Sequence, residues 1–488
     1  MRNLATPVLL ALATLAHAGP PNIVFILSDD VGYGDLVCYG ATKVKTPSLD
    51  RLAREGTRFT DAHSTGSVCT PTRFAFMSGR YAWRQAGTGI APGNATLLIK
   101  PGTPTVPSVL KQAGYATGIV GKWHLGLGET TPDFNQEIAP GPRELGFEYS
   151  FIIPATGDRT PCVFVENGRV VGLDPADPIT VSYGTRIGTD PTGLERPDLL
   201  KIKADPNHSQ TIVNGVSRIG YMTGGMKARW VDEDIADTLT GRAVAFLEKQ
   251  KSGRPFFLYL ATHDIHEPMV PHPRFRGTSE CGWRGDVIHQ LDWTVGQVLA
   301  TLERLGFAKD TLVVFSSDNG GAIKNTYDDG TNALHSRQPP NGVLRGQKGT
   351  LYEGGHRVPF IARWPGHIPA GRESDALLGL VDLLPSFAAL AGQKLPAGAG
   401  PDAVDVSAAL LGQPGAKGRA SLVLQNNGQQ PLALRAGPWK LLTRPNGAAE
   451  LYNLSADLSE AKNLAADEPA RVKELAALLA AERAKDTR

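Results

Sequence analysis

The chain has 488 residues, of which 41% are hydrophobic and 20% charged, as in a globular protein with a large buried core. Its length favours two or more domains. Lysine and arginine total 50 against 48 aspartate and glutamate, which leaves a formal net charge of +2. Because so small a net charge gives no long-range field, we expect neither nucleic acid nor a membrane surface as a partner.

Residues 1–18 have the pattern of a secretory signal peptide. Arg2 supplies a short basic region, residues 8–15 are apolar, and Ala16-His17-Ala18 matches an A-x-A cleavage site. The apolar run is too short to span a bilayer, and no later stretch is long enough to do so. We therefore expect an exported protein, periplasmic or secreted, without a membrane anchor.

Four continuous apolar runs predict strands that are buried on both faces, as in a parallel sheet. These runs are residues 22–27, 115–120, 255–260 and 311–316. Helical patterns accompany them at residues 46–53, 107–113, 239–249 and 291–305. The alternation predicts an α/β fold with a large, mostly parallel sheet flanked by helices.

Each predicted strand is followed by side chains that could carry chemistry. They are Asp29 and Asp30 after the first run, Lys122 and His124 after the second, His263 and His266 after the third, and Asp318 and Asn319 after the fourth. Because ligands bind at the carboxyl ends of parallel strands, we expect these side chains to converge. For any one of them a helix cap or a solvated loop is the simpler explanation, but the same arrangement at four strand ends favours a site.

The remaining segments predict long loops and a second domain. Residues 127–235 are rich in Pro, Gly and Asp, and we interpret them as loops over the active edge of the sheet. The later elements are expected as a strand at 358–363, a helix at 381–391, a linker at 392–401, hairpin strands at 421–424, 431–435 and 439–442, and a long helix after Pro469. We predict a catalytic domain at residues 19–396 and a C-terminal subdomain of antiparallel sheet plus helix at 397–488.

A cysteine, a proline and an arginine stand together at the start of a helical pattern, in Cys69-Thr-Pro-Thr-Arg73. Pro71 suits the first position of a helix, which places Cys69 at or just before the helix N-terminus, where backbone N–H groups favour anions. A buried, inert thiol is the common fate of a free cysteine. The alternative is a nucleophile, or the precursor of one. The other three cysteines, Cys38, Cys162 and Cys281, are too few for a disulfide framework.

The oxygen donors at the strand ends, Asp29, Asp30, Asp318 and Asn319, predict a site for a hard cation, with Ca²⁺ favoured over Mg²⁺ or zinc. Three cations and two candidate proton carriers accompany them: Arg73, Lys122, Lys348, His124 and His266. Lys348 lies in a glycine-rich loop, for which a plain turn with an exposed lysine is the simpler explanation. Together these groups favour transfer of a phosphoryl or sulfuryl group.

These motifs resemble those of the type I sulfatases, in the alkaline phosphatase superfamily. Cys69-Thr-Pro-Thr-Arg73 is similar to the family's C-x-P-x-R signature, with Thr72 where many members have serine. Further matches follow in the family's order at Ser28-Asp29-Asp30, Gly121-Lys122-x-His124, His266-x-Pro268, Ser317-Asp318-Asn319-Gly320 and Lys348-Gly-x-x-Tyr-Glu-Gly-Gly355. The resemblance runs from about Pro21 to the terminal helix and implies an alkaline-phosphatase-like fold.

The resemblance implies hydrolysis of a sulfate ester by a modified Cys69. A formylglycine-generating or sulfatase-maturing enzyme would oxidise this residue to Cα-formylglycine, whose hydrate attacks sulfur. His266, helped by Lys348, would protonate the leaving alcohol, and His124 would then deprotonate the second hydroxyl so that sulfate leaves. Ca²⁺ would be held by Asp29, Asp30, Asp318, Asn319 and residue 69. Arg73 would orient the hydrate, while sulfate would be bound by Lys122, Lys348 and His266.

Two other functions fit parts of the pattern. One is a phosphonate or phosphate ester hydrolase on the same scaffold, although a zinc phosphatase needs more histidines beside the carboxylates. The other is a non-catalytic binder of sulfated glycans with unmodified Cys69, although binding does not require two proton carriers. His263 and His266 compete for the acid role, and the His-Glu-Pro context favours His266.

The chain is most similar in appearance to bacterial exported sulfatases of carbohydrates, so we expect a sulfated glycan, with a 6-O-sulfated galactose or N-acetylgalactosamine favoured. Loop residues that could contact a sugar are Arg159, His208, Arg229, Trp230, His272 and Arg274.

Overall fold

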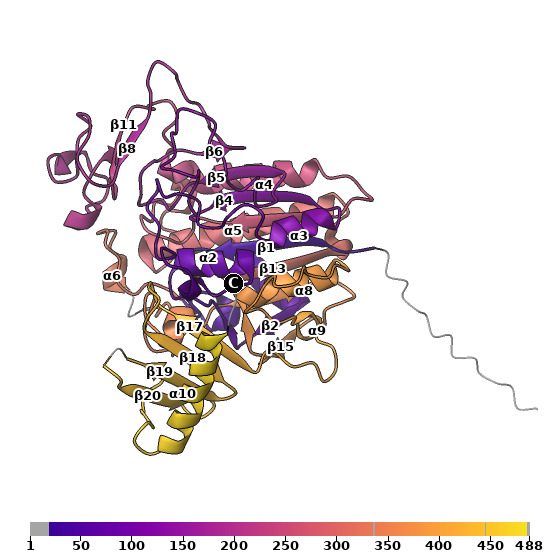
Figure 1. The fold of residues 1–488 in the computed structure, drawn as a ribbon. Helices are drawn as coiled ribbons and strands as arrows, with labels where there is room; N and C mark the ends of the chain where they lie inside the picture. The colour runs from indigo at the N-terminus through magenta and orange to yellow at the C-terminus, as the bar shows by residue number, and fades with distance from the viewer. Residues whose placement is uncertain (1–18, 335–336, 445, 486–488) are drawn as a thin grey trace, which may run out of the picture.

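A computed structural model describes residues 19–334, 337–444 and 446–485. Its central element is a ten-stranded sheet (Figure 1). In spatial order the strands are β15 (Arg372–Ser374), β2 (Thr57–Phe59), β14 (Phe360–Arg363), β13 (Thr311–Ser317), β1 (Asn22–Ser28), β12 (Phe256–Ala261), β4 (Ala116–Lys122), β5 (Tyr149–Ile153), β6 (Val165–Glu166) and β7 (Arg169–Val170). The five strands from β13 to β5 run parallel, which confirms the predicted sheet. The expected strand at 358–363 is β14, and it pairs antiparallel with β13.

Helices cover both faces of this sheet. Phe25 and Phe257 pack against Phe387 of α8 (Leu383–Leu390), and Phe25 also packs against Phe76 of α2 (Cys69–Ser78). Gly118 of β4 pairs with Leu258, the neighbour of Phe257 on β12, and it lies against Phe246 of α4 (Ile235–Glu248). Because successive residues of a strand face opposite sides, α4 covers the other face. The face covered by α2 and α8 also carries α3 (Val106–Gln112). The face covered by α4 also carries α1 (Pro47–Glu55) and α5 (Gly282–Arg304).

Three predicted helix starts differ from the structure. The helices expected at 239 and 291 begin at Ile235 and Gly282, because buried side chains such as Val287 extend the core-facing stripe of α5 towards its N-terminus. The helix at Cys69 begins at that residue itself, so Pro71 is its third residue and not its first. Proline is accommodated there because the first-turn N–H groups have no partner within the helix.

The loops at 127–235 extend from the β5 side of the sheet (Figure 1). They carry short two-stranded ladders, β8 (Thr180–Ser182) with β11 (Tyr221–Thr223) and β9 (Ile212–Val213) with β10 (Val216–Ser217). A further short ladder joins β3 (Ala62–His63) to β16 (Leu378–Gly379). Single-turn helices are α6 (Thr331–Leu334), α7 (Glu353–His356) and α9 (Ser407–Leu410).

A small antiparallel sheet follows near the C-terminus. It contains β17 (Ser421–Gln425), β18 (Leu432–Ala436), β19 (Trp439–Thr443) and β20 (Ala449–Asn453), and α10 (Pro469–Ala484) packs on it through Leu475 and Leu479. The three predicted strands and the helix are confirmed, and β20 is an additional strand. Leu410 still packs in the core of the large sheet, so the division after residue 396 stays a prediction.

The signal peptide predicted at residues 1–18 lies outside the described residues. Within the described ranges, no helix combines the length and the apolar character needed to cross a membrane. All four cysteines are free thiols.

Truncating the centre of the large sheet should destabilise the fold. Ile26 is fully buried between Leu260 and Phe315, so Ile26→Ala should lower the free energy of unfolding by about 2–5 kcal/mol. Leu194, which is 67% exposed, offers a control whose change to alanine should cost less than about 0.5 kcal/mol. Urea unfolding followed by circular dichroism measures both, and equal midpoints for the two variants would contradict the register.

Candidate active site

The polar residues after the four central strands meet at one edge of the sheet. Strands β13, β1, β12 and β4 are neighbours in that order, and their carboxyl ends lie together because the strands are parallel. Backbone hydrogen bonds join the segments beyond the strands, since Asp29 N donates to Asp264 O at 3.0 Å and Asp318 N donates to Ser28 O at 3.1 Å. The predicted convergence of these strand ends is confirmed.

Three carboxylates and three cations form buried ion pairs at this edge. Lys122 Nζ lies 2.8 and 2.7 Å from the two carboxylate oxygens of Asp29. Arg73 Nη2 lies 2.7 Å from Asp318 Oδ2, and Lys348 Nζ lies 2.8 Å from Asp30. The first two pairs are fully buried, and the Lys348 side chain is 18% exposed. Their charges balance, which is the condition under which so many charges can be buried.

Burial and the neighbouring cations act in opposite directions on the pKa values of Asp29 and Asp30, and a different effect dominates at each residue. Burial raises the pKa of Asp29 to about 8, although the Lys122 ammonium opposes the shift. Burial also acts to raise the pKa of Asp30, but Lys348 and Lys122 bring it below its usual value. Burial therefore disfavours the charged form of Asp29, and further positive charge in the site would favour it.

Cys69 is the first residue of α2, a helix that is buried along its whole length. Burial raises the pKa of its thiol, even though the nearby ammonium groups of Lys122 and Lys348 act in the opposite direction. Thr72 stabilises the preceding turn by donating its hydroxyl to Gly66 O at 2.8 Å. A neutral thiol is a poor nucleophile, so the unmodified side chain is not activated for attack.

Arg73 lies one turn further along α2 and spans the site. Beyond its pair with Asp318, its Nη1 donates to Lys122 O at 3.0 Å and to the Tyr259 hydroxyl at 3.3 Å. Tyr259 was not foreseen from the sequence, because it lies inside the apolar run of β12 and has no motif around it. The guanidinium thus ties α2 to strands β4 and β12 and to the segment that follows β13.

The two candidate proton carriers are buried and neutral. His124 Nε2 donates to Ala91 O at 2.8 Å, and its Nδ1 has no partner. His266 Nδ1 donates to Glu267 O at 2.5 Å, which leaves Nε2 facing Asp30 Oδ2 at 3.9 Å. Burial lowers the pKa of both imidazoles well below the usual range, with Lys122 adding to the effect in each case.

His263 lies beside His266 with a ring-centroid separation of 6.3 Å. Burial lowers the pKa of His263 to about 3, and its ring packs so closely on Gly157 that a Cβ there would lie 2.4 Å from the ring. His266 is the histidine that faces Asp30, as the sequence context favoured.

The residues of the site fit a hard divalent cation. The amide oxygen of Asn319 is buried without a hydrogen-bond partner, while its Nδ2 donates to Asp30 Oδ1 at 2.7 Å. Carboxylate oxygens of Asp29 and Asp30 lie within 4.8 Å of each other and of a His266 nitrogen. Oxygen donors of this kind prefer Ca²⁺ or Mg²⁺, and a cation there would lower the raised pKa of Asp29.

Three polar residues from the loops at 127–235, Asp158, Arg159 and His208, form a group near His266. Asp158 is buried and accepts two hydrogen bonds from Arg159 Nη1 at 2.8 and 2.7 Å, and His208 Nε2 lies 3.5 Å from it. The pKa of Asp158 lies well below its usual value, because the effects of Arg159 and His208 exceed that of burial, which acts to raise it. Asp158 has no sequence motif, whereas Arg159 and His208 were named as sugar contacts.

The other four residues named as sugar contacts have different surroundings. Arg229 pairs with Asp190, Trp230 is buried against Phe164, and His272 and Arg274 face Asp237.

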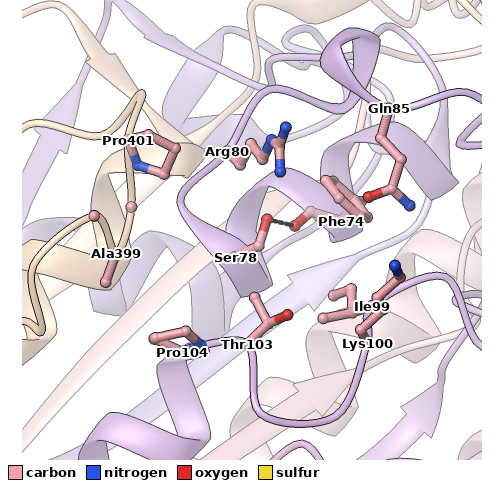
Figure 2. Close-up of a pocket in the computed structure, with 12 residues that line it drawn as sticks. Phe74, Ser78, Arg80, Gln85, Ile99, Lys100, Thr103, Pro104, Ala399 and Pro401 are labelled. Atoms are coloured by element: carbon pink, nitrogen blue, oxygen red, sulfur yellow. Dashed lines mark hydrogen bonds between the residues drawn. The ribbon is translucent and has the colours of Figure 1, made fainter. Parts of the chain in front are cut away.

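A cavity of about 220 Å³ at the far end of α2 is separate from this site (Figure 2). It is lined by residues such as Ser78, Arg80, Lys100, Thr103 and Pro401, and by none of the predicted catalytic residues. The predicted catalytic residues therefore gather at the N-terminus of α2 and not around this cavity.

Comparison with known proteins agrees with this arrangement. Residues 21–393 match the Sulfatase family model. The chain is 48% identical over 475 residues to an N-acetylgalactosamine-6-O-sulfatase of Bacteroides thetaiotaomicron, covering 94% of this chain and 92% of the relative. It is 39% identical over 409 residues to human arylsulfatase A, covering 83% and 70%. A structure solved in a study of glycosaminoglycan metabolism by B. thetaiotaomicron superposes with a TM-score of 0.93 at 47% identity, covering 96% of this chain and all of that one.

The chain therefore belongs to the sulfatase family, with its alkaline-phosphatase-like fold. It is a sulfuric ester hydrolase, which confirms the predicted enzyme class.

Removing one partner of a buried pair should be costly here. Arg73→Met removes the cation nearest to the buried Asp318 carboxylate and leaves it only Lys122 Nζ at 3.8 Å, which should lower the free energy of unfolding by about 3–5 kcal/mol. The exposed pair of Arg196 and Asp198 provides the control, since Arg196→Met should leave the unfolding temperature almost unchanged. Thermal unfolding measures both, and an Arg73→Met protein as stable as the control would show that the pair does not support the site.

Proposed function

We propose that the protein hydrolyses the 6-O-sulfate ester of an N-acetylgalactosamine residue in a sulfated glycan. The observation that carries this proposal is the charge-balanced group of three carboxylates and three cations around Cys69, at the strand ends of a sulfatase. The substrate is inferred from the relative that shares 48% of its sequence, whose name states that specificity. Galactose 6-sulfate is the neighbouring alternative, because it differs only at C2.

Residue 69 supplies the nucleophile in this proposal. Its high thiol pKa argues against a thiolate, whereas oxidation to formylglycine by a maturing enzyme provides a hydrated aldehyde that can attack sulfur and later release sulfate. Lys122 and Lys348 then have a second use beyond neutralising carboxylates, because their ammonium groups can hold sulfate oxygens. Arg73 lies on the same helix as residue 69, and its bond to Asp318 fixes the position of residue 69 relative to that carboxylate.

A bound Ca²⁺ would be held by Asp29, Asp30, Asp318, Asn319 and residue 69, and it would polarise the sulfate group. The unpaired oxygen of Asn319 and the raised pKa of Asp29 support this assignment. The chain's own cations would then face the substrate.

Proton transfer is assigned to the two histidines and Lys348. Burial acts to lower the pKa of Lys348, but the charge of Asp30 and its hydrogen bond to Lys348 raise it above its usual value, so its ammonium stays protonated. His266 is neutral before substrate binds, and the negative charge of a bound sulfate raises the pKa of its Nε2. His266 and Lys348 can then protonate the leaving oxygen, while the unpaired Nδ1 of His124 is free to accept a proton.

The sugar is assigned to the Asp158–Arg159 side of the site. A carboxylate and a guanidinium held together by two hydrogen bonds offer an acceptor and donors to adjacent sugar hydroxyls. The Arg159 side chain is 15% exposed, which leaves it accessible to a ligand. The signal-peptide pattern supports export to the periplasm or beyond, where such glycans are encountered.

Release of sulfate from defined monosaccharides tests the substrate. The matured protein should release sulfate from N-acetylgalactosamine 6-sulfate at least about tenfold faster, as kcat/KM, than from the 4-sulfate or from N-acetylglucosamine 6-sulfate. Activity confined to a steroid or aryl ester would refute the carbohydrate assignment. Arg159→Met should lower kcat/KM on the sugar at least about tenfold and on a nitrophenyl sulfate less than about threefold. Equal losses on both substrates would remove Arg159 from sugar recognition.

The proton donor is tested by changing the leaving group. His266→Ala should lower kcat on the sugar sulfate about 100-fold or more, because an alkoxide must be protonated as it leaves. On a nitrophenyl sulfate, whose phenoxide leaves unaided, the loss should stay below about tenfold. His263→Ala serves as the control, and a larger dependence on leaving group in that variant would transfer the role to His263.

A further inference from the structure

A buried charged cluster lies where the four-stranded sheet meets the large domain. We call it the junction cluster, and its members are Asp61, His63, Glu353, His356 and Arg357 from the large domain and Arg435, Lys440 and Glu460 from the C-terminal part. Lys440 of β19 is fully buried, and its Nζ lies 3.0 Å from Glu353 Oε1 and 2.8 Å from Glu460 Oε1. Glu353 N donates in turn to Glu460 Oε2 at 2.6 Å.

Arginines complete the cluster around Glu353 and Asp61. Arg357 Nη1 lies 2.9 Å from Glu353 and 3.2 Å from Asp61, and Arg435 Nη2 lies 2.9 Å from Asp61. Three acids thus face three permanent cations, so that neutral imidazoles are needed for the charges to balance. Burial lowers the pKa of both His63 and His356, which keeps them neutral.

The three residues His63, Glu353 and His356 have the spacing of a metal site, but cations already occupy it. Lys440 Nζ lies 3.0 Å from His356 Nε2, and His356 Nδ1 lies 3.0 Å from His63 Nδ1. His63 Nε2 lies 2.8 Å from Asp61 Oδ1. Every ring nitrogen thus has a polar partner within the protein. The cluster is therefore a structural network and not a metal centre.

Glu353 and His356 belong to the segment that carries Lys348. Within residues 345–356, Lys348 N donates to Gly321 O at 3.2 Å and Gly349 N donates to Ser67 O at 2.7 Å. Gly320, next to Asn319, donates to Gly355 O at 2.9 Å. A Cβ on Gly320 would lie 1.9 Å from Gly354 O, so this close backbone contact requires glycine.

A glycine-rich loop has high conformational freedom, and fixing it needs an anchor outside itself. In addition to these backbone contacts, the C-terminal part provides an anchor: Lys440 and Glu460 hold the end of the segment, and Arg345 Nη1 at its beginning donates to Glu460 O at 2.8 Å. Because Arg345 Nη1 also donates to the Tyr452 hydroxyl of β20 at 3.2 Å, both ends of 345–356 are tied to the four-stranded sheet.

We propose that Lys440 and Glu460 are positioning residues for the sulfatase reaction: they fix the segment 345–356 and thereby the placement of Lys348 against Asp30 and the substrate sulfate. The role of Lys348 in this proposal rests on the function proposed above. It gives the C-terminal sheet a part in catalysis without any contact with the substrate.

A double-mutant comparison in the full-length, matured protein tests the proposal. Lys440→Met and the milder Glu460→Gln should lower kcat on a sulfate ester, the first by about 10- to 100-fold, because a small displacement of a catalytic group has effects of this size. In a Lys348→Ala background, Lys440→Met should lower kcat by less than about twofold further. Lys440→Arg, which keeps the charge, should restore part of the loss.

A matched control is available at another buried ion pair of the same junction. Arg419 Nη1 lies 2.6 Å from Asp382 and Nη2 donates to the Tyr81 hydroxyl at 2.8 Å, without contact to residues 345–356. Arg419→Met should lower the unfolding temperature as much as Lys440→Met does, yet keep kcat within about threefold of wild type. The proposal would be overturned if kcat fell in proportion to the loss of unfolding temperature in both variants. It would also be overturned if Lys440→Met lowered kcat by the same factor in the wild-type and the Lys348→Ala backgrounds.

Hydrogen exchange provides a measurement that does not depend on activity. Lys440→Met should increase amide exchange in residues 345–356 and at Gly320, whereas Arg419→Met should not. Unchanged exchange there would refute the positioning role even if kcat fell. If the wild-type protein released no sulfate from any ester, the proposed function would fail, and the exchange result alone would still decide whether Lys440 fixes the segment.

Discussion

The structure depends on the burial of three carboxylates and three cations around one point at the edge of a parallel sheet. Each charge would be very costly alone, and together they hold α2, the strand ends and the glycine-rich loop in one arrangement. The same balance leaves the site able to receive a cation and an anion together. In the function we propose, a divalent ion would be held by the carboxylates, which would leave the lysines available to the sulfate group.

Much of this site could be predicted because parallel strands bring distant residues to one edge. Asp29, Lys122, His266 and Asp318 follow apolar runs, and neighbouring strands place them together. Tyr259 could not be found this way, since nothing marks which residue of a buried strand meets Arg73.

The starts of α4 and α5 were also missed, because a helix boundary depends on where the core ends and not on local pattern alone. The local sequence pattern also could not show that Asp158 or the residues of the junction cluster would be important. Glu353 lies in a family motif, but its partners Lys440 and Glu460 come from segments far along the chain, and only the fold shows that they meet. Residues that contact one another through a domain junction carry no periodic signal, whereas strand-end residues do.

The central claim is that residue 69 works as formylglycine and not as a thiol. The most direct test is the mass of the peptide that contains residue 69, measured on protein made with and without a maturing enzyme, together with sulfate release by the same samples. The account predicts that the loss of mass expected for conversion of the CH₂–SH group to an aldehyde appears only in the matured protein, and that sulfate release rises in proportion to it. Full activity in protein whose Cys69 is unmodified would contradict the account.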